Sequence, residues 1–531
     1  MDTNTATADK AAATDNDAFG TTHPLEVAGT AAHQRAVTAD NDAFGPARGC
    51  FAQMLSWLEG SEAAAMSAAE LEDEVVRRGR EAQRLALQDH LDLRALRERR
   101  VEATDENGVA HAVIEPGHRR QLSTVMGTVT VERLAYRHAG TSNLHPADSV
   151  LNLPERLHSH GLRRMAVVES TRGSFDDASA AIERATGVAV AKRQVESLTA
   201  AAAVDIEDFY VSRGPEPGAT DDVLVISVDG KGIVMRPEGL RASTAKAAAT
   251  APTKLGNRLS KGEKRYRKRM AEVGAVYDIT PVARTPADVL ASTHGDAPPP
   301  APKASGKWVT ASVSADAAQV VASVFDEGQR RDPDHQRSWL ALVDGNNHQI
   351  DRINQEAENR KLQVTIVVDL IHVMEYIWGA AWCFFEEGDA AAQDWVRDKT
   401  LAVLSGNARQ VAAGIRRRAT TSGLAKLKRT NADKCATYLT NKADYLDYPK
   451  ALAAGWPIAT GVIEGTCRYL VADRMDITGA RWSVAGAEAV LKLRAVRSNG
   501  DLDAYWNWHL DHELQRTHRS RYANGVIPVA A

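Results

Sequence analysis

Three apolar stretches of the sequence each end in an aspartate. They are LVISVDG with Asp229, LALVDG with Asp344 and TIVVD with Asp369. Apolar runs of this kind are typical of buried strands, so a carboxylate at the end of one projects from the edge of a sheet. Adjacent strands lie about 5 Å apart, which lets aspartates at neighbouring strand ends share a divalent cation. Crowded carboxylates repel one another unless a hard cation neutralises them.

A fourth acid, Glu464, lies in the stretch GWPIATGVIEGTCRYLVADRMDITGARW, which also carries Arg468, Arg474 and Arg481. We interpret Glu464 as the head of a helix that brings a further carboxylate to the aspartates. Each aspartate alone is a common strand-to-turn residue that accepts turn hydrogen bonds. The four acids together, with basic tracts nearby, favour a two-metal phosphoryl-transfer site.

The region before these strands reads as mainly helical. Residues 51–102 have apolar positions at helical spacing, and STVMGTVTVERLAYR alternates around Gly127 as a β-hairpin does. A helix is expected to start at the N-cap Ser174 and to stop at Gly187, and a second helix follows it. The second helix opens with three polar residues, Lys192, Arg193 and Gln194. This pattern fits a helix-turn-helix, and it fits a plain helical hairpin equally well.

The segment RGPEPGATDD, residues 213–222, marks a boundary. Beyond it, VLVISVDGKGIVMR is expected to form a strand, a polar turn and a second strand. Residues 254–269 hold eight Lys/Arg against one Glu, and we expect a loop and a helix start there. GAVYDI, KWVTASV, SWLALVDG and VTIVVDLIH predict further strands, while residues 373–454 look helical and charged. One last helix is expected through AGAEAVLKLRAVRSNGDLDAYWNWHL.

Composition limits the classes of protein that remain. The 531 residues have 44% hydrophobic and 25% charged content and a net charge of −4, an ordinary globular balance. The four cysteines are far apart and form no CxxC pair, which argues against a zinc ribbon or a disulfide framework. The first forty residues lack a continuous apolar core, and no run is long enough to span a bilayer. We therefore expect neither a signal peptide nor a membrane association.

These residues resemble those of ISKra-family insertion-sequence transposases, which are DDE-type enzymes related to Mutator-like transposases. The resemblance covers about residues 50–520. It rests on VDGKGIVMR, KRMAEVGAVYDI, RDPDHQRSWLALVDGNNHQI, VVDLIHVMEYIW and ATGVIEGTCRYLVADRMDITGARW. It implies an α/β fold with an RNase H-like catalytic core, a mixed sheet flanked by helices. An all-α insertion would interrupt this core, and a mainly helical DNA-binding region would precede it. The implied divisions are a disordered tail at 1–48, the DNA-binding region at 49–215 with the helix pair at 174–203, the core at 222–372 and 456–531, and the insertion at 373–455.

The resemblance also implies the roles of the acids. Asp229 corresponds to the first catalytic carboxylate, Asp344 to the second and Glu464 to the last, and these three would bind metal. Asp369 and His372 match an auxiliary D-x-x-H motif beside the site. The reverse assignment, with Asp369 in place of Asp344 as the ligand, stays open.

The implied activity is cleavage at terminal inverted repeats followed by strand transfer, with two Mg²⁺ or Mn²⁺ ions and no small-molecule cofactor. The expected partners are transposon-end DNA, target DNA and further copies of the chain, in a bacterial cytoplasm. Two alternatives remain: a stand-alone RNase H-like nuclease, and a non-catalytic DNA-binding protein derived from a transposase. The candidate DNA contacts are Lys192, Arg193, Gln194, Lys264, Arg265, Lys268, Arg269, Arg468 and Arg481.

Overall fold

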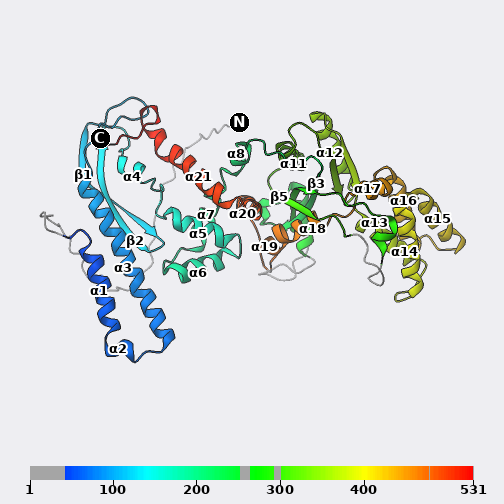
Figure 1. The fold of residues 1–531 in the computed structure, drawn as a ribbon, viewed down its shortest axis with the longest axis horizontal. Helices are drawn as coiled ribbons and strands as arrows, with labels where there is room; N and C mark the ends of the chain where they lie inside the picture. Colours follow the sequence, from blue (N-terminus) through cyan, green and yellow to red (C-terminus); the bar gives the residue numbers. More distant parts are fainter. Residues whose placement is uncertain (1–41, 251–262, 292–299, 478, 530–531) are drawn as a thin grey trace, which may run out of the picture.

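The computed structural model describes residues 42–250, 263–291, 300–477 and 479–529. Most of the expected N-terminal tail, residues 1–41, lies outside the described residues, but helix α1 already begins at Gly45. In Figure 1 an arm of long helices and a β-hairpin lie at one end of the molecule, the larger sheet lies near the middle, and a group of helices lies at the other end.

The arm consists of α1 (Gly45–Leu58), the single turn α2 (Ser61–Ala64) and the thirty-residue α3 (Ala68–Arg97). The Ser67 side chain caps α3, and Glu70 bonds back to the Ser67 backbone, which satisfies otherwise unpaired N–H groups. The expected hairpin is confirmed. Strand β1 (Val113–Thr124) pairs with β2 (Gly127–Arg137) in antiparallel register, and α3 packs along β2.

A group of short helices links the hairpin to the sheet. They are α4 (Pro146–Val150), α5 (His160–Ser170), α6 (Phe175–Thr186), α7 (Lys192–Ala201) and α8 (Ile206–Val211). The helix pair expected after Ser174 is confirmed as α6 and α7: Ser174 and Asp177 form a capping box, and Gly187 ends α6 with φ +72°.

The central sheet has five strands in the order β5-β4-β3-β6-β7. Its strands are β3 (Val223–Val234), β4 (Lys268–Ile279), β5 (Ala304–Ser312), β6 (Trp339–Val343) and β7 (Val364–Val368). Strands β3, β4 and β5 are antiparallel, whereas β3, β6 and β7 run parallel. The helices α11 (Ala317–Arg331), α12 (Asn347–Arg360), α13 (Leu370–Ala381) and α20 (Val484–Ser498) pack around this sheet, and their apolar side chains join those of the strands in one core. The predicted mixed sheet flanked by helices is therefore present.

One local expectation for this sheet is wrong. The stretch around Asp229 is one continuous strand, because β3 stays paired with β4 as far as Val234↔Lys268. The strand tolerates glycine at 230 and 232 because side chains of the neighbouring strand fill the space over them. The described part of the basic tract forms the short 3₁₀ helix η2 (Glu263–Arg267) and then the start of β4, since strand pairing with β3 extends to residue 268.

The interval between β7 and Glu464 is helical. After α13 come α14 (Ala390–Leu404), α15 (Ala408–Thr421), α16 (Thr430–Asn441), η3 (Ala443–Tyr445) and α17 (Tyr448–Ala453). Tyr448 donates a hydrogen bond to the carbonyl of Val368 at 2.8 Å, which anchors these helices to the end of β7. The chain then forms α18 (Gly461–Thr466), the π-helical turn η4 (Cys467–Ala472) and α19 (Asp473–Met475).

The expected single last helix is also wrong. It is two helices, α20 and α21 (Leu502–Thr517), broken at Gly500 with φ +81°. Helix α21 runs back toward the hairpin (Figure 1), where Glu513 binds Arg163 of α5 in a buried ion pair. The remaining short elements are η1 (Pro237–Gly239), α9 (Ala242–Thr250), α10 (Pro286–Leu290), η5 (Arg519–Arg521) and η6 (Ala523–Gly525).

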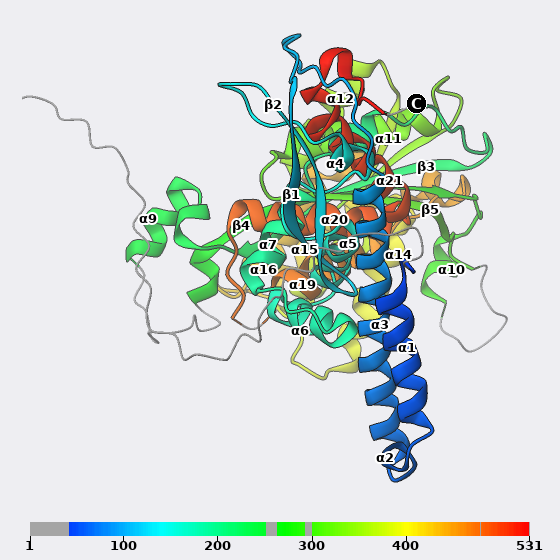
Figure 2. The same cartoon turned by 90° about the vertical axis from the view of Figure 1, so that its left-hand side faces the viewer.

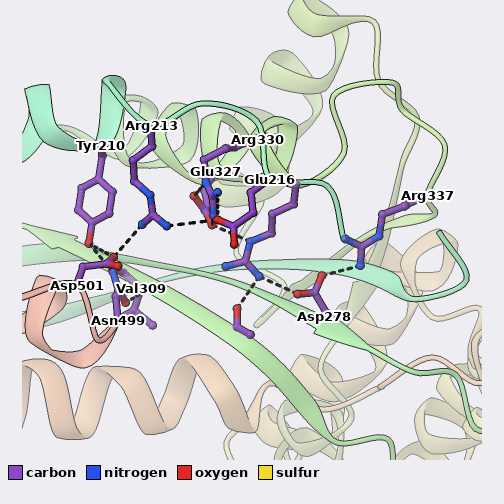
Figure 3. Close-up of polar contacts among 12 residues, drawn as sticks. Tyr210, Arg213, Glu216, Asp278, Val309, Glu327, Arg330, Arg337, Asn499 and Asp501 are labelled. Carbon is purple, nitrogen blue, oxygen red and sulfur yellow. Dashed lines mark hydrogen bonds and ion pairs between the residues drawn. The ribbon is translucent and has the colours of Figure 1, made fainter. Parts of the chain in front are cut away.

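The boundary segment 213–222 is held to the sheet by a network of ion pairs (Figure 3). Arg330 binds Glu216 at 2.6 Å and its carbonyl accepts the Glu216 N–H, while Arg331 binds Asp278 at 2.9 Å. Asp278 pairs in register with the start of β3, so this network lies at the edge of the sheet away from Asp229. Its charges are mutually satisfied, which gives it a structural role in joining the two halves of the chain.

Candidate active site

The three aspartates lie in one row across the sheet. The parallel register pairs Ser227 with Leu342, and Asp229 and Asp344 each follow two residues later. The next register pairs Val343 with Val368, one residue before Asp344 and Asp369. Since neighbouring strands lie about 4.8 Å apart, the backbone positions of the three aspartates are adjacent at this edge of the sheet. The prediction that Asp229 ends its strand is wrong. The parallel pairing of β3 with β6 stops just before Asp229, but β3 itself continues to Val234.

Asp229 and Asp344 line the same cavity, which has a volume of about 310 Å³. Glu272 of β4 lines it too, and sequence reasoning missed this residue. Burial, together with the charge of Asp229, raises the pKa of Glu272 above its usual value. An acid among the apolar residues of β4 was a sequence signal, but only strand pairing places it opposite Gly230. The cavity also takes two basic side chains from α12, His348 and Arg352.

Asp369 has a different environment from Asp344. Its side chain is completely buried, and it caps α13. Its Oδ1 accepts the backbone N–H of Thr460 at 2.8 Å, and its Oδ2 accepts the N–H of His372 at 3.0 Å. The Nδ1 of His372 lies 2.8 Å from the same Oδ2. Both oxygens are therefore already engaged by the protein.

The segment that carries Glu464 crosses the carboxyl edge of the sheet. It starts beside β7, where Leu370 N–H donates to the carbonyl of Ile458 at 2.9 Å. It then packs over β3 and β4, where the thiol of Cys467 lies 3.3 Å from Oδ2 of Asp229. Glu464 lies between these two anchors, exposed, with its Oε1 accepting the Thr460 hydroxyl at 3.2 Å. The π-helical turn begins at Cys467; such turns are frequent at functional sites.

A possible ligand set with histidine also forms here. Ligand atoms of Asp369, His372 and Glu464 all lie within 4.8 Å of one another. Burial acts to lower the pKa of His372, but the hydrogen bond and charge of Asp369 outweigh it, and Asp344 adds to the increase. A raised pKa favours the imidazolium, which binds anions and not metals. Among the described residues this ligand set is the one group of three or more potential ligand side chains that come this close together, and neither Asp229 nor Asp344 belongs to it. Its two carboxylates are the kind of ligand that Mg²⁺ or Mn²⁺ prefers.

The candidate DNA contacts are scattered over the fold. At the start of α7, Lys192 pairs with Asp176, Arg193 is exposed, and Gln194 accepts the N–H of Ala191 as a cap. Near β4, Lys264 and Lys268 both pair with Asp476, whereas Arg269 donates to the carbonyl of Val313 at 2.8 Å. The side chain of Arg265 lies outside the described residues.

The three arginines after Glu464 have different environments. Arg474 is buried, its Nε donates to the carbonyl of Ser170 at 2.9 Å, and its guanidinium lies 4.7 Å from the ring centroid of Trp482. Arg468 and Arg481 are exposed, and no carboxylate of the described residues lies within ion-pair distance of either. Glu464 and Arg468, although four residues apart on one helical stretch, thus form no ion pair.

Trp482 is a core residue. It is buried, and its Nε1 donates to the carbonyl of Met475 at 3.0 Å. The four cysteines are free thiols, and across the described ranges no helix has the length and apolarity needed to cross a membrane. No protein-family model matches the chain, and a search of curated proteins found no match.

Proposed function

We propose that the protein is a DDE-type DNA transposase of the ISKra kind, with an RNase H-like core interrupted by the helices at 373–455. It binds the terminal inverted repeats of an insertion sequence and catalyses metal-dependent strand cleavage and strand transfer. The observation that carries the proposal is the registered row of Asp229, Asp344 and Asp369 with Glu464 placed across it. Four acids from distant parts of the chain are assembled at one sheet edge, which is costly without a cation.

Asp229, Asp344 and Glu464 are the proposed ligands of two Mg²⁺ or Mn²⁺ ions. Asp344 is preferred over Asp369 because it lines the cavity with Asp229, whereas Asp369 is completely buried and caps α13. When bound, such ions activate the attacking oxygen and stabilise the leaving oxygen of an in-line displacement.

Asp369 and His372 act beside the metal ligands. Asp369 fixes the start of the Glu464 helix and orients the imidazole through Nδ1. The other ring nitrogen, Nε2, is left to donate to a phosphate oxygen, a role that the raised pKa favours.

DNA binding is assigned to exposed cations on both halves of the chain. Arg193 at the start of α7, and Arg468 and Arg481 after Glu464, are exposed. Such residues supply salt-dependent affinity for phosphates. Holding two element ends together requires more than one copy of the chain, and the proposed setting is the bacterial cytoplasm.

The test is cleavage of labelled DNA that carries the sequences flanking the coding region, with Mg²⁺ present. Asp229→Asn, Asp344→Asn and Glu464→Gln are expected to lose cleavage while keeping DNA binding in a mobility-shift assay. Asp351→Asn, an exposed acid on α12, is the matched control and should cleave normally. Full cleavage by Asp229→Asn would reject the site.

A stand-alone nuclease is the second candidate, because the same acids fit hydrolysis alone. Incubating cut ends with a supercoiled target separates the two, since a nuclease gives no joined product. A chain that binds the ends and neither cuts nor joins them is a non-catalytic DNA-binding protein.

A further inference from the structure

The arm made by α1 and α3 carries an apolar groove far from the acids. Figures 1 and 2 both show the half of the arm that carries α2 projecting away from the rest of the chain. The groove has a volume of about 630 Å³, and the described residues that line it all belong to the arm. On α1 the lining residues recur at helical spacing, from Phe44 through Phe51 to Leu55, and on α3 they are Gly79, Ala82, Gln83 and Ala86.

The groove combines large projecting side chains with a floor of small ones. Phe51 is 50% exposed and Leu55 is 45% exposed, whereas Ala82 is buried. A Cβ added at Gly79 would meet no atom within 4 Å, so the floor has open space beside the two large side chains. The projecting side chains of one copy can fill the open floor of a second copy that is related to it by a two-fold axis. The surface is therefore self-complementary. An antiparallel helix pair also buries only one face of each helix and gains stability when a second pair covers it.

The charges on the arm are separated along its length. Residues 49–76, which include its tip, hold six acidic side chains and no basic one. Residues 77–100, where α3 meets the hairpin, hold eight Lys/Arg against four Asp/Glu. A second arm laid antiparallel puts each acidic tip against a basic base, whereas a parallel arm puts acid against acid. The acidic tip also repels nucleic acid, so DNA does not fit as the occupant.

We propose that this groove is a homodimer interface in which two arms pair antiparallel as a four-helix bundle. Phe51 and Leu55 of each copy then lie over the small residues of α3 in the partner. The proposal does not rest on the catalytic assignment, because the arm contributes none of the acids. It locates the self-association that a two-ended DNA substrate requires.

The experiment is sedimentation equilibrium on the full chain, compared among variants. The wild type is expected to dimerise, and Phe51→Glu with Leu55→Glu should weaken dimerisation at least about 100-fold, since charges replace the anchors of the interface. Gly79→Trp should do the same by filling the floor, and it removes a helix-weakening glycine, so the monomer stays folded. Gly49→Trp is the matched control: this α1 glycine also has open space around it, lies outside the groove, and should leave the dimer unchanged.

Charge reversal at the tip fixes the direction of pairing. Glu72→Lys with Asp73→Lys should weaken an antiparallel dimer several-fold at low salt, because it removes attraction to the partner's arginines. The same change would strengthen a parallel dimer by relieving repulsion, and that result overturns the antiparallel arrangement.

Two further outcomes overturn the proposal outright. One is a wild-type chain that is monomeric throughout. In that case, a shortened chain that dimerises once residues 1–41 are removed would show that this segment occupies the groove. The other is a dimer that survives Gly79→Trp and the double glutamate variant alike, which places the interface elsewhere. Loss of DNA cleavage with the dimer intact leaves this proposal standing and rejects only the proposed function.

Discussion

Oδ1 of Asp369 accepts a hydrogen bond from the backbone N–H of Thr460 at 2.8 Å, across 91 residues of sequence. This contact joins the end of β7 to the start of the helix that carries Glu464. The start of that helix is therefore fixed directly to the end of β7. In the proposed site, Asp369 is the positioning residue and Asp344 is the metal ligand.

The first prediction separates these two aspartates. Asp369→Ala should lower the free energy of unfolding by about 1–3 kcal/mol, because it leaves the buried Thr460 N–H without an acceptor. Asp344→Ala should cost less than about 0.5 kcal/mol, since the side chain is only partly buried. Mn²⁺ calorimetry should show the reverse order, with binding lost in Asp344→Ala and only weakened in Asp369→Ala. Equal loss of Mn²⁺ binding with no loss of stability in Asp369→Ala would favour the opposite assignment.

The second prediction concerns repulsion among the acids. Without divalent ions, Asp229→Asn should stabilise the protein by about 1 kcal/mol, because it removes one of several crowded carboxylates. Saturating Mg²⁺ should stabilise the wild type, by about 2.7 kcal/mol at a hundred times its dissociation constant, and should not stabilise the variant. Thermal unfolding in chelator and in Mg²⁺ measures both effects, with Asp351→Asn as the control. A wild type that gains nothing from Mg²⁺ or Mn²⁺ would contradict the metal site.

The third prediction distinguishes the arginines that follow Glu464. Arg474→Met should cost about 2 kcal/mol of stability, because the guanidinium lies 5.4 Å from the ring centroid of Phe175 and 4.7 Å from that of Trp482. Burial lowers the pKa of Arg474 to about 10, with the charge of Arg494 adding to the decrease. Arg468→Ala and Arg481→Ala should change stability by less than about 0.5 kcal/mol. If these arginines contact phosphates, each substitution should lower the slope of log affinity for DNA against log salt concentration by about one. A binding titration from low to high salt measures this slope.

The fourth prediction concerns pH. Burial lowers the pKa of His145 from 6.5 to about 4, and the nearby Arg133 adds to the decrease. Between these pH values the unfolded chain binds a proton at this residue and the folded chain does not. The contribution of His145 to the free energy of unfolding is therefore complete above about pH 6.5 and is lost as the pH drops toward 4.

Replacing His145 with Gln should flatten that part of the stability curve, measured by urea denaturation at a series of pH values. His90→Gln, which changes an exposed histidine on α3, is the control and should leave the curve unchanged. An identical slope in the His145 variant would show that other groups cause the acid sensitivity.

The locally encoded parts of the fold were predictable. Three such features lie where the sequence indicates: the helix cap at Ser174, the helix end at Gly187 and the hairpin turn at Gly127. Each of them depends only on residues a few positions away in the sequence. Expectations failed where a neighbouring strand or helix decided the outcome. The glycines after Asp229 suggest a turn, yet pairing with β4 keeps them in a strand.

For the site, the sequence by itself determined which residue types follow the apolar strands, because a short apolar run indicates a buried strand without further information. It singled out Asp229, Asp344, Asp369 and Glu464, and it left the choice between Asp344 and Asp369 open. Only the tertiary structure decided that the three aspartates share one register, that Glu272 joins the first two, and that Asp369 is fully engaged by Thr460 and His372. Strand order and hydrogen bonds across 91 residues depend on the packing of the whole chain, which no local pattern encodes.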